Sequence, residues 1–192
     1  MNDLHVARSE LILGGQKSGK SRRAENLAAA WLQASSSHRA VLIATAEAHD
    51  DEMRQRIARH QRERAERVPG LLTLEASCDL PAAIGAAGGA ETLRVVDCLT
   101  LWLTGLMMPL GRENQSAQAV QGEVALLLET IESTSGPIIL VGNEIGLGVI
   151  PLGREVRAFV DALGVLNQQM AQRCERVSLM AAGLPLVLKG EA

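Results

Sequence analysis

The sequence lacks the features that mark two large classes of protein. Its apolar runs, such as the one around residues 137–141, are far shorter than the roughly 20 residues that a membrane-spanning helix needs. Its net charge of -3 and pI near 5.8 do not give the strongly basic surface typical of general nucleic-acid binding. We therefore expect neither a membrane span nor a nucleic-acid partner, and any charge that binds phosphate must be local.

Cysteine is also scarce, with Cys78, Cys98 and Cys174 forming an odd set without the spacing of metal ligands. The first ten residues contain no apolar stretch of the kind found in a secretory signal. Together these absences favour a reducing cytoplasm. What the chain does have is 192 residues with 47% hydrophobic content, enough for one domain with a sizeable core over residues 1–192.

Short apolar runs alternate with longer stretches that suit helices. We predict strands over residues 11–13, 40–44, 93–97, 138–141 and 177–181. We predict helices over residues 20–33, 51–67, 98–108, 117–133 and 154–173. Because strands that are apolar throughout must be covered on both sides, this alternation predicts an α/β fold with a mainly parallel sheet and helices on both faces.

A phosphate-binding motif follows the first predicted strand. The residues Gly14, Gly15, Gln16, Lys17, Ser18, Gly19, Lys20 and Ser21 fit G-x-x-x-x-G-K-[ST]. Its glycines let backbone N–H groups turn toward phosphate oxygens, and the helix N-terminus favours negative charge. Lys20 should meet the β- and γ-phosphates, and Ser21 should bind Mg²⁺. A glycine-rich turn without function is the alternative, but the strand–loop–helix setting favours a P-loop NTPase-like domain.

Asp97 ends the third predicted strand, where ligands gather in open α/β sheets. Its carboxylate could bind Mg²⁺ directly or through water. The alternative is that Asp97 caps the helix that follows, a position that aspartate suits well. We favour contact with metal or nucleotide.

The second predicted helix carries a histidine on a partly apolar face. Met53, Ile57, His60 and Arg64 follow helical spacing, which predicts that His60 points inward or along a cleft. Arg56 and Arg64 lie one turn to either side, where their charge would attract a triphosphate. Histidine can carry a covalent intermediate and so split one nucleotidyl transfer into two steps. A packed or surface histidine is the alternative.

His49 is a competing candidate for the nucleophile, because it lies beside Asp50 and Asp51. These two acids also suit the first turn of the helix, where negative charge is stabilising. Position alone therefore does not choose between His49 and His60.

Further motifs occur in order along almost the whole chain. They are residues 13–15, 20–22 and 24–25; 43–46; 50–53 with 56–57 and 60; 97–104; 143–151; 166–168; and 182–185. Together they resemble the adenosylcobinamide kinase/adenosylcobinamide-phosphate guanylyltransferase family of cobalamin assembly. The Asp-Asp-Glu-Met…Arg-Ile-x-x-His and Asn-Glu-x-Gly-x-Gly segments make this resemblance far more specific than the P-loop alone.

The resemblance implies two activities. A nucleoside triphosphate, ATP or GTP, phosphorylates a corrinoid hydroxyl, and His60 then takes GMP from GTP and passes it to the corrinoid phosphate. The resemblance also implies which residues surround the guanine nucleotide: Ala44, Thr45, Ala46, Gln61, Arg62, Glu63, Arg64, Glu75 and Asp97. Around Glu75 the tryptophan and acidic pair usual in the family are absent. It further implies a homo-oligomer, a trimer in this family, whereas Mg²⁺ as cofactor is implied by the P-loop itself.

Two other functions stay open from the residues alone. One is a different small-molecule kinase in which His60 only orients the acceptor. The other is a nucleotide-gated binding module that transfers nothing.

Overall fold

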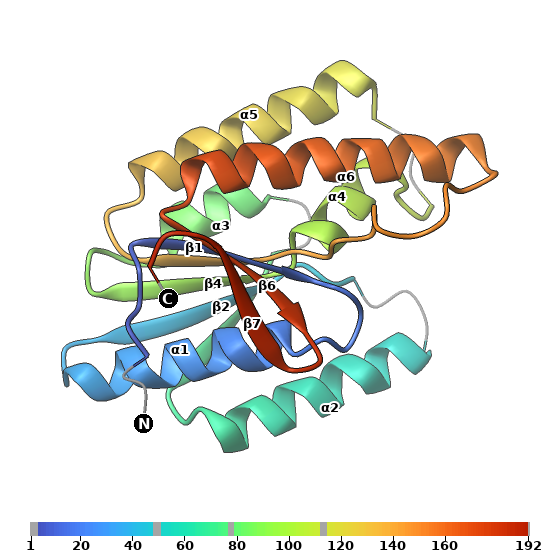
Figure 1. The fold of residues 1–192 in the computed structure, drawn as a ribbon. Helices are drawn as coiled ribbons and strands as arrows, with labels where there is room; N and C mark the ends of the chain where they lie inside the picture. The colour runs from blue at the N-terminus through green and yellow to red at the C-terminus, as the bar shows by residue number, and fades with distance from the viewer. Residues whose placement is uncertain (1–3, 48–50, 77–78, 112–114, 192) are drawn as a thin grey trace.

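A seven-stranded sheet separates two layers of helices (Figure 1). The computed structural model describes residues 4–47, 51–76, 79–111 and 115–191. The strands are β1 Ser9–Gly14, β2 Arg39–Ala44, β3 Leu71–Glu75, β4 Thr92–Asp97, β5 Ile138–Val141, β6 Arg176–Ala181 and β7 Leu184–Lys189. Their order is β3-β2-β4-β5-β1-β6-β7, and all neighbouring pairs are parallel except β6 and β7.

The helices cover both faces of the sheet. α1 Lys20–Ala34 and α2 Asp51–Arg67 lie on one face. The other face carries α3 Leu80–Ala86, α4 Leu99–Met107, α5 Ala117–Ser133 and α6 Arg154–Arg173 (Figure 1). The prediction of an α/β fold with a mainly parallel sheet covered on both faces is thereby confirmed. Within the described segments, no helix combines the length and the apolar character needed to cross a membrane.

The alternation of side chains along β1 shows why its apolar run is continuous. Leu11 and Leu13 point into the core beneath α3 to α6, where Trp102 is fully buried. Ile12 points to the opposite side and packs in the core beneath α1, with Leu27. Since successive residues of a strand face opposite sides, a strand buried on both sides must be apolar at every position.

All five predicted strands and five predicted helices are present, with boundaries that differ by a few residues at most. α4 begins at Leu99 rather than residue 98, because Cys98 is its N-cap residue. Three elements were not predicted: β3, α3 and β7. β3 and β7 are the two edge strands of the sheet, and their side chains are mostly exposed.

The strand order gathers the expected functional segments at one edge. The six parallel strands all end on the same side, and their carboxyl ends lead into the P-loop after β1, Thr45 after β2 and Asn143 after β5. Glu75 and Asp97 are themselves the last residues of β3 and β4. In open parallel sheets this edge is where ligands bind.

Candidate active site

The P-loop has a backbone that only glycine can supply at two positions. Gly14 has a φ of 151°, and a Cβ at this residue would lie 2.6 Å from the Met180 carbonyl oxygen. Gly19 has a φ of 104°, and its Cβ would lie 3.2 Å from Cα of Gly183. These close contacts with β6 and the turn after it fix the path of the loop, so that α1 starts immediately behind it.

Lys20 lies folded over this loop. Its side chain is almost fully buried, and Nζ donates a hydrogen bond of 2.6 Å to the carbonyl oxygen of Gly15. Burial lowers the pKa of Lys20, although the negative charge of Asp97 partly opposes this shift. Burial removes water from the ammonium group, and a bound phosphate would supply negative charge that stabilises its protonated form. The ammonium group is therefore placed to bind an anion.

Ser21 and Asp97 meet across the site. The Ser21 hydroxyl donates a hydrogen bond of 3.1 Å to Oδ2 of Asp97, from the start of α1 to the end of β4. Asp97 does not cap α4, because the N-cap residue is Cys98 and no side chain caps that helix. A hydroxyl and a carboxylate side by side are the oxygen ligands that Mg²⁺ uses in proteins together with substrate phosphates and water.

Thr45 joins the ends of β2 and β4. Its buried hydroxyl donates to the Cys98 carbonyl at 2.7 Å and accepts from the Cys98 N–H at 2.8 Å. The Thr45 N–H also donates to the Asp97 carbonyl oxygen at 3.1 Å. Thr45 therefore holds the end of β4 in place through its side chain at Cys98 and its backbone N–H at Asp97, while its neighbours Ala44 and Ala46 stay partly exposed at the strand end.

His60 projects from α2 into a pocket shared with the P-loop. The pocket has a volume of about 390 Å³ and is lined by Gln16, Lys17, Glu52, Gln55, Arg59 and His60. The imidazole is exposed, so the structure puts His60 along a cleft rather than inward. A histidine on one side of this pocket and phosphate-loop residues on the other can approach the same polyphosphate.

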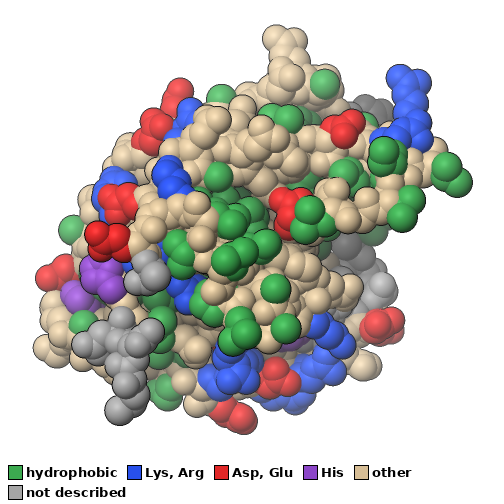
Figure 2. Space-filling view, in the orientation of Figure 1, with side chains coloured by type: hydrophobic (Ala, Val, Ile, Leu, Met, Phe, Trp, Pro, Cys, Tyr) green, Lys and Arg blue, Asp and Glu red, His purple; other side chains and the backbone are tan. Residues whose placement is uncertain are grey.

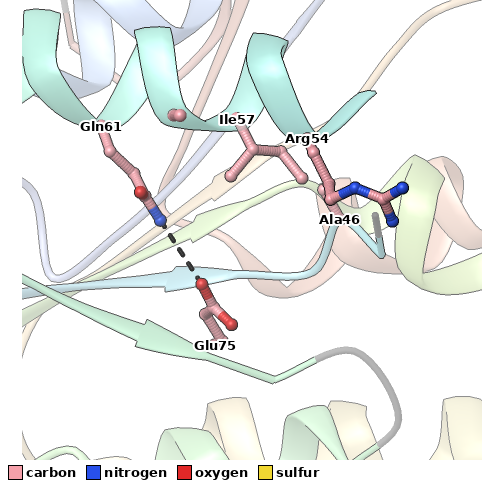
Figure 3. Close-up of a pocket in the computed structure, with 6 residues that line it drawn as sticks. Ala46, Arg54, Ile57, Gln61 and Glu75 are labelled. Carbon is pink, nitrogen blue, oxygen red and sulfur yellow. Dashed lines mark hydrogen bonds between the residues drawn. The ribbon is translucent and has the colours of Figure 1, made fainter. Parts of the chain in front are cut away.

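A second pocket lies between α2 and the end of β3 (Figure 3). It has a volume of about 240 Å³ and is lined by Ala46, Arg54, Ile57, Ala58, Gln61 and Glu75. The Gln61 amide donates a hydrogen bond of 3.4 Å to Oε1 of Glu75 across this space (Figure 3). A carboxylate, a guanidinium and an aliphatic wall give this pocket the means to bind a planar polar group.

The residues after Gln61 are not brought together as a group. Arg62 and Glu63 face solvent on α2. Arg64 was expected beside His60 but is buried, and its Nε lies 3.7 Å from the Glu25 carboxylate of α1. The charge of Arg64 is thus directed at α1, and among residues 61–64 only Gln61 lines a described pocket.

The other histidines are accounted for differently. His49 and Asp50 lie outside the described residues. His38 stacks on Trp31 with ring centroids 3.7 Å apart, and His5 lies 3.3 Å from Arg176. These two have structural partners away from the P-loop.

The model of the family described as "Cobinamide kinase / cobinamide phosphate guanyltransferase" matches residues 10–188. The chain belongs to this family. The match takes in the P-loop, the helix that carries His60 and the Asn143–Glu144 segment, and it confirms the resemblance inferred from the motifs. It also confirms that the protein is an enzyme, a kinase and guanylyltransferase.

Relatives of known name agree with this assignment. The chain is 48% identical to the bifunctional adenosylcobalamin biosynthesis protein CobP of Pseudomonas aeruginosa, over 95% of this chain and 98% of that protein. It is 32% identical to the bifunctional adenosylcobalamin biosynthesis protein CobU of Salmonella typhimurium, over 93% of this chain and 98% of that protein. Both relatives are thus matched over nearly their full length.

One solved structure supports the fold. The crystal structure of the flagellar accessory protein FlaH from Methanocaldococcus jannaschii matches with a TM-score of 0.51 and 14% identity, over 97% of this chain and 80% of that one. At this identity the likeness concerns the fold alone.

Several residues at the site were given no role of their own from the sequence, although Glu25, Glu52 and Asn167 lie within the family motifs. Glu52, Gln55 and Arg59 line the His60 pocket, and their spacing of three and four residues puts them on one side of α2. That spacing was a usable signal. Glu25 contacts Arg64 of another helix, and Asn167 contacts Asn143 in a loop. No local sequence pattern reveals such tertiary contacts.

Proposed function

We propose that the enzyme carries out both of the family's reactions at the P-loop, with His60 as the carrier of GMP. In the first reaction a nucleoside triphosphate phosphorylates adenosylcobinamide. In the second, GMP passes from GTP to His60 and then to adenosylcobinamide phosphate, which gives adenosylcobinamide-GDP. The observation that supports this proposal is the pocket in which His60 faces Gln16 and Lys17 of the P-loop.

The guanylyl transfer consists of two displacements. A ring nitrogen of His60 attacks the α-phosphorus of GTP, the bond from that phosphorus to the bridging oxygen breaks, and pyrophosphate leaves. A phosphate oxygen of the acceptor then attacks the same phosphorus, and the P–N bond breaks to restore His60. Covalent catalysis of this kind replaces one difficult step with two easier ones.

The P-loop supplies charge stabilisation in both reactions. Lys20 would leave the Gly15 carbonyl to contact phosphate oxygens, where its buried ammonium opposes developing negative charge. Ser21 and Asp97 would hold Mg²⁺, directly or through water, and their hydrogen bond at 3.1 Å gives the oxygen pair that such a site needs. The metal would neutralise charge on the triphosphate.

The pocket beside Glu75 suits guanine. The carboxylate of Glu75 can accept hydrogen bonds from the N–H groups on the Watson–Crick edge of guanine, which adenine lacks in that arrangement. Ile57 offers an apolar wall, and Ala46 leaves room at the end of β2 (Figure 3). We propose that this pocket selects GTP for the guanylyl transfer, with Gln61 exchanging its bond to Glu75 for one to the base or ribose.

We also propose that the enzyme acts as a homo-oligomer in the cytoplasm, where both nucleotides are supplied. Hydrophobic side chains gather over β7 in the space-filling view (Figure 2). Leu184, Leu186 and Leu188 are 71%, 57% and 55% exposed on this edge strand. An exposed apolar edge of this kind is normally covered by a partner.

The decisive experiment measures the intact mass of the protein after incubation with GTP and Mg²⁺. A GMP adduct that maps to His60 under mildly alkaline conditions, which preserve a phosphoramidate, is the expected result. The His60→Ala variant should form no adduct and should still phosphorylate adenosylcobinamide. Equal loss of both reactions in that variant, or no adduct on wild-type protein that binds GTP, would overturn the assigned role of His60.

A further inference from the structure

A carboxylate at the site has no role in the reactions described so far. Glu144 follows β5, the strand that lies between β1 and β4 in the sheet. Its backbone N–H donates a hydrogen bond of 3.1 Å to the carbonyl oxygen of Gly14, the first residue of the P-loop. The Glu144 backbone therefore lies directly beside the phosphate-binding loop.

The Glu144 side chain is held by hydrogen-bond donors that leave its charge uncompensated. Oε1 accepts from the Gly146 N–H at 3.0 Å, and Oε2 lies 3.5 Å from Nδ2 of Asn167. Asn167, a residue of α6, is 4% exposed and also donates a hydrogen bond of 3.1 Å to the Asn143 carbonyl oxygen. These two contacts of Asn167 hold the Asn143–Glu144 segment against α6. Among the described residues, no lysine or arginine forms an ion pair with Glu144.

The other acids near the carboxyl ends of the strands lie elsewhere in the site. Asp97 accepts the hydrogen bond from Ser21, and Glu75 ends β3, at the far edge of the sheet from the P-loop strand. Glu52 faces the pocket of His60 from α2. Asn167 belongs to α6, on the opposite face of the sheet from α2, so Glu144 approaches the P-loop from the side away from His60 (Figure 1).

The kinase reaction requires a group that takes a proton from the acceptor. A hydroxyl is a weak nucleophile, and in phosphoryl transfer a carboxylate commonly accepts its proton while orienting it toward the γ-phosphorus. Among the residues that follow Glu144, Leu147 and Val149 present apolar side chains to solvent, being 81% and 97% exposed. An acceptor that contacts these apolar side chains would meet the P-loop on the side of Glu144 rather than across α2.

We propose that Glu144 is the general base of the kinase reaction, an assignment that rests on the proposed function. The Glu144 carboxylate takes the proton of the acceptor hydroxyl as the hydroxyl oxygen forms a bond to the γ-phosphorus. The bond from that phosphorus to the β–γ bridging oxygen breaks, and the nucleoside diphosphate leaves. The products are a phosphate monoester and a protonated Glu144, which returns its proton to solvent. Glu144 has no part in the transfer of GMP to and from His60.

The test compares Glu144→Gln with Glu144→Asp and with a control, Glu129→Gln, which removes an exposed carboxylate from α5. Glu144→Gln should lower kcat of adenosylcobinamide phosphorylation by about 100-fold or more, the usual contribution of a general base, with little change in KM for ATP. Glu144→Asp should recover part of this loss. The control should match the wild-type enzyme.

Two measurements separate this role from a structural one. Formation of the His60 adduct from GTP, and its transfer to adenosylcobinamide phosphate supplied ready-made, should stay within about threefold of wild type in Glu144→Gln. Kinase activity within that same range, or parallel loss of the kinase reaction and the adduct, would overturn the assignment. Wild-type protein that forms the adduct and phosphorylates nothing would overturn the proposed kinase reaction and this assignment with it, whereas absence of the adduct alone would count only against the role of His60.

Discussion

Glu25 lies with its carboxylate 3.2 Å from the guanidinium of Arg67, and this ion pair joins α1 to α2. Arg64 approaches the same carboxylate at 3.7 Å, and the Glu25 side chain is only 6% exposed. Since α1 starts with P-loop residues and α2 carries His60, the cluster fixes the histidine helix relative to the phosphate loop. Glu25 is thus a positioning residue for a group that it does not touch.

Glu25→Ala should destabilise the protein and slow guanylylation of His60. Removing the carboxylate leaves two arginines without their buried partner, a loss on the order of 3 kcal/mol in unfolding free energy. The rate of adduct formation should fall more than the affinity of the P-loop for ATP, because the lost ion pairs position α2, whereas the P-loop is fixed by its own contacts with β6 and the turn after it. Urea unfolding and intact-mass kinetics measure the two effects. Glu66→Ala, an exposed change on α2 next to Arg67, should leave both within error, and an equally large effect there would contradict this role of Glu25.

The same residue gives a pH prediction. Burial raises the pKa of Glu25 above its ordinary value, and the nearby arginines offset this only in part. A carboxyl with a raised pKa in the folded state keeps its proton there while the unfolded chain loses it. The unfolding free energy of wild type, relative to Glu25→Gln, should therefore fall as pH rises from the ordinary carboxyl value of 4.5 through the raised folded value. A flat difference between the two proteins across that range would contradict it.

The sequence predicted those parts of the site that depend on local chain geometry. The P-loop follows from glycine spacing, and Gly14 and Gly19 do have the positive φ values that favour glycine. Strands buried on both faces appear in the sequence as continuous apolar runs, and β1, β2, β4, β5 and β6 were all predicted from such runs. The order of these strands, and hence which acids meet the P-loop, depends on pairing between distant segments that the sequence does not show.

The elements that were missed have physical reasons. β3 and β7 are edge strands with exposed side chains, so their patterns lack the apolar continuity of the central strands. α3 has only seven residues, too few for a helical period, although Asp79 as N-cap and Pro81 in the first turn were usable signals. The tight turn at Ala182 and Gly183, with φ values of 51° and 82°, likewise marked the β6–β7 hairpin.

Asp97→Asn should weaken Mg²⁺ binding and slow both transfer reactions. The substitution keeps the shape of the side chain but removes the charge that would face the metal, and the Ser21 hydroxyl alone is a weak ligand. We expect a loss of about 100-fold in kcat/KM for each reaction at low Mg²⁺, partly recovered by excess metal. Titration of both activities with Mg²⁺ measures this. Asp161→Asn, an exposed change on α6, should leave the titration unchanged, and an unchanged titration for Asp97→Asn would remove this residue from the metal site.

Glu75→Gln should reduce the preference for guanine. A glutamine keeps one acceptor oxygen but loses the charge, and a hydrogen bond to a charged group contributes about 1.5 to 3 kcal/mol. The GTP concentration needed for half-maximal formation of the His60 adduct should then rise by at least about 10-fold, while KM for ATP in the kinase reaction stays constant. The ATP measurement is the internal control. A parallel change for both nucleotides would mean that Glu75 affects the fold or the triphosphate rather than the base.

Leu186→Glu on β7 should separate the subunits of the proposed homo-oligomer. Leu186 is 57% exposed at the centre of the edge strand, and a carboxylate there would have to be buried without a partner in an assembly covering this face. Sedimentation velocity should show a shift toward monomer at concentrations where wild type is assembled. The matched control is Leu126→Glu on α5, at a leucine that is 48% exposed, which should leave the assembly intact. If both variants sediment like an assembled wild type, the leucine face of β7 is not the contact between subunits; if wild type itself is a monomer, the proposal of an oligomer is wrong.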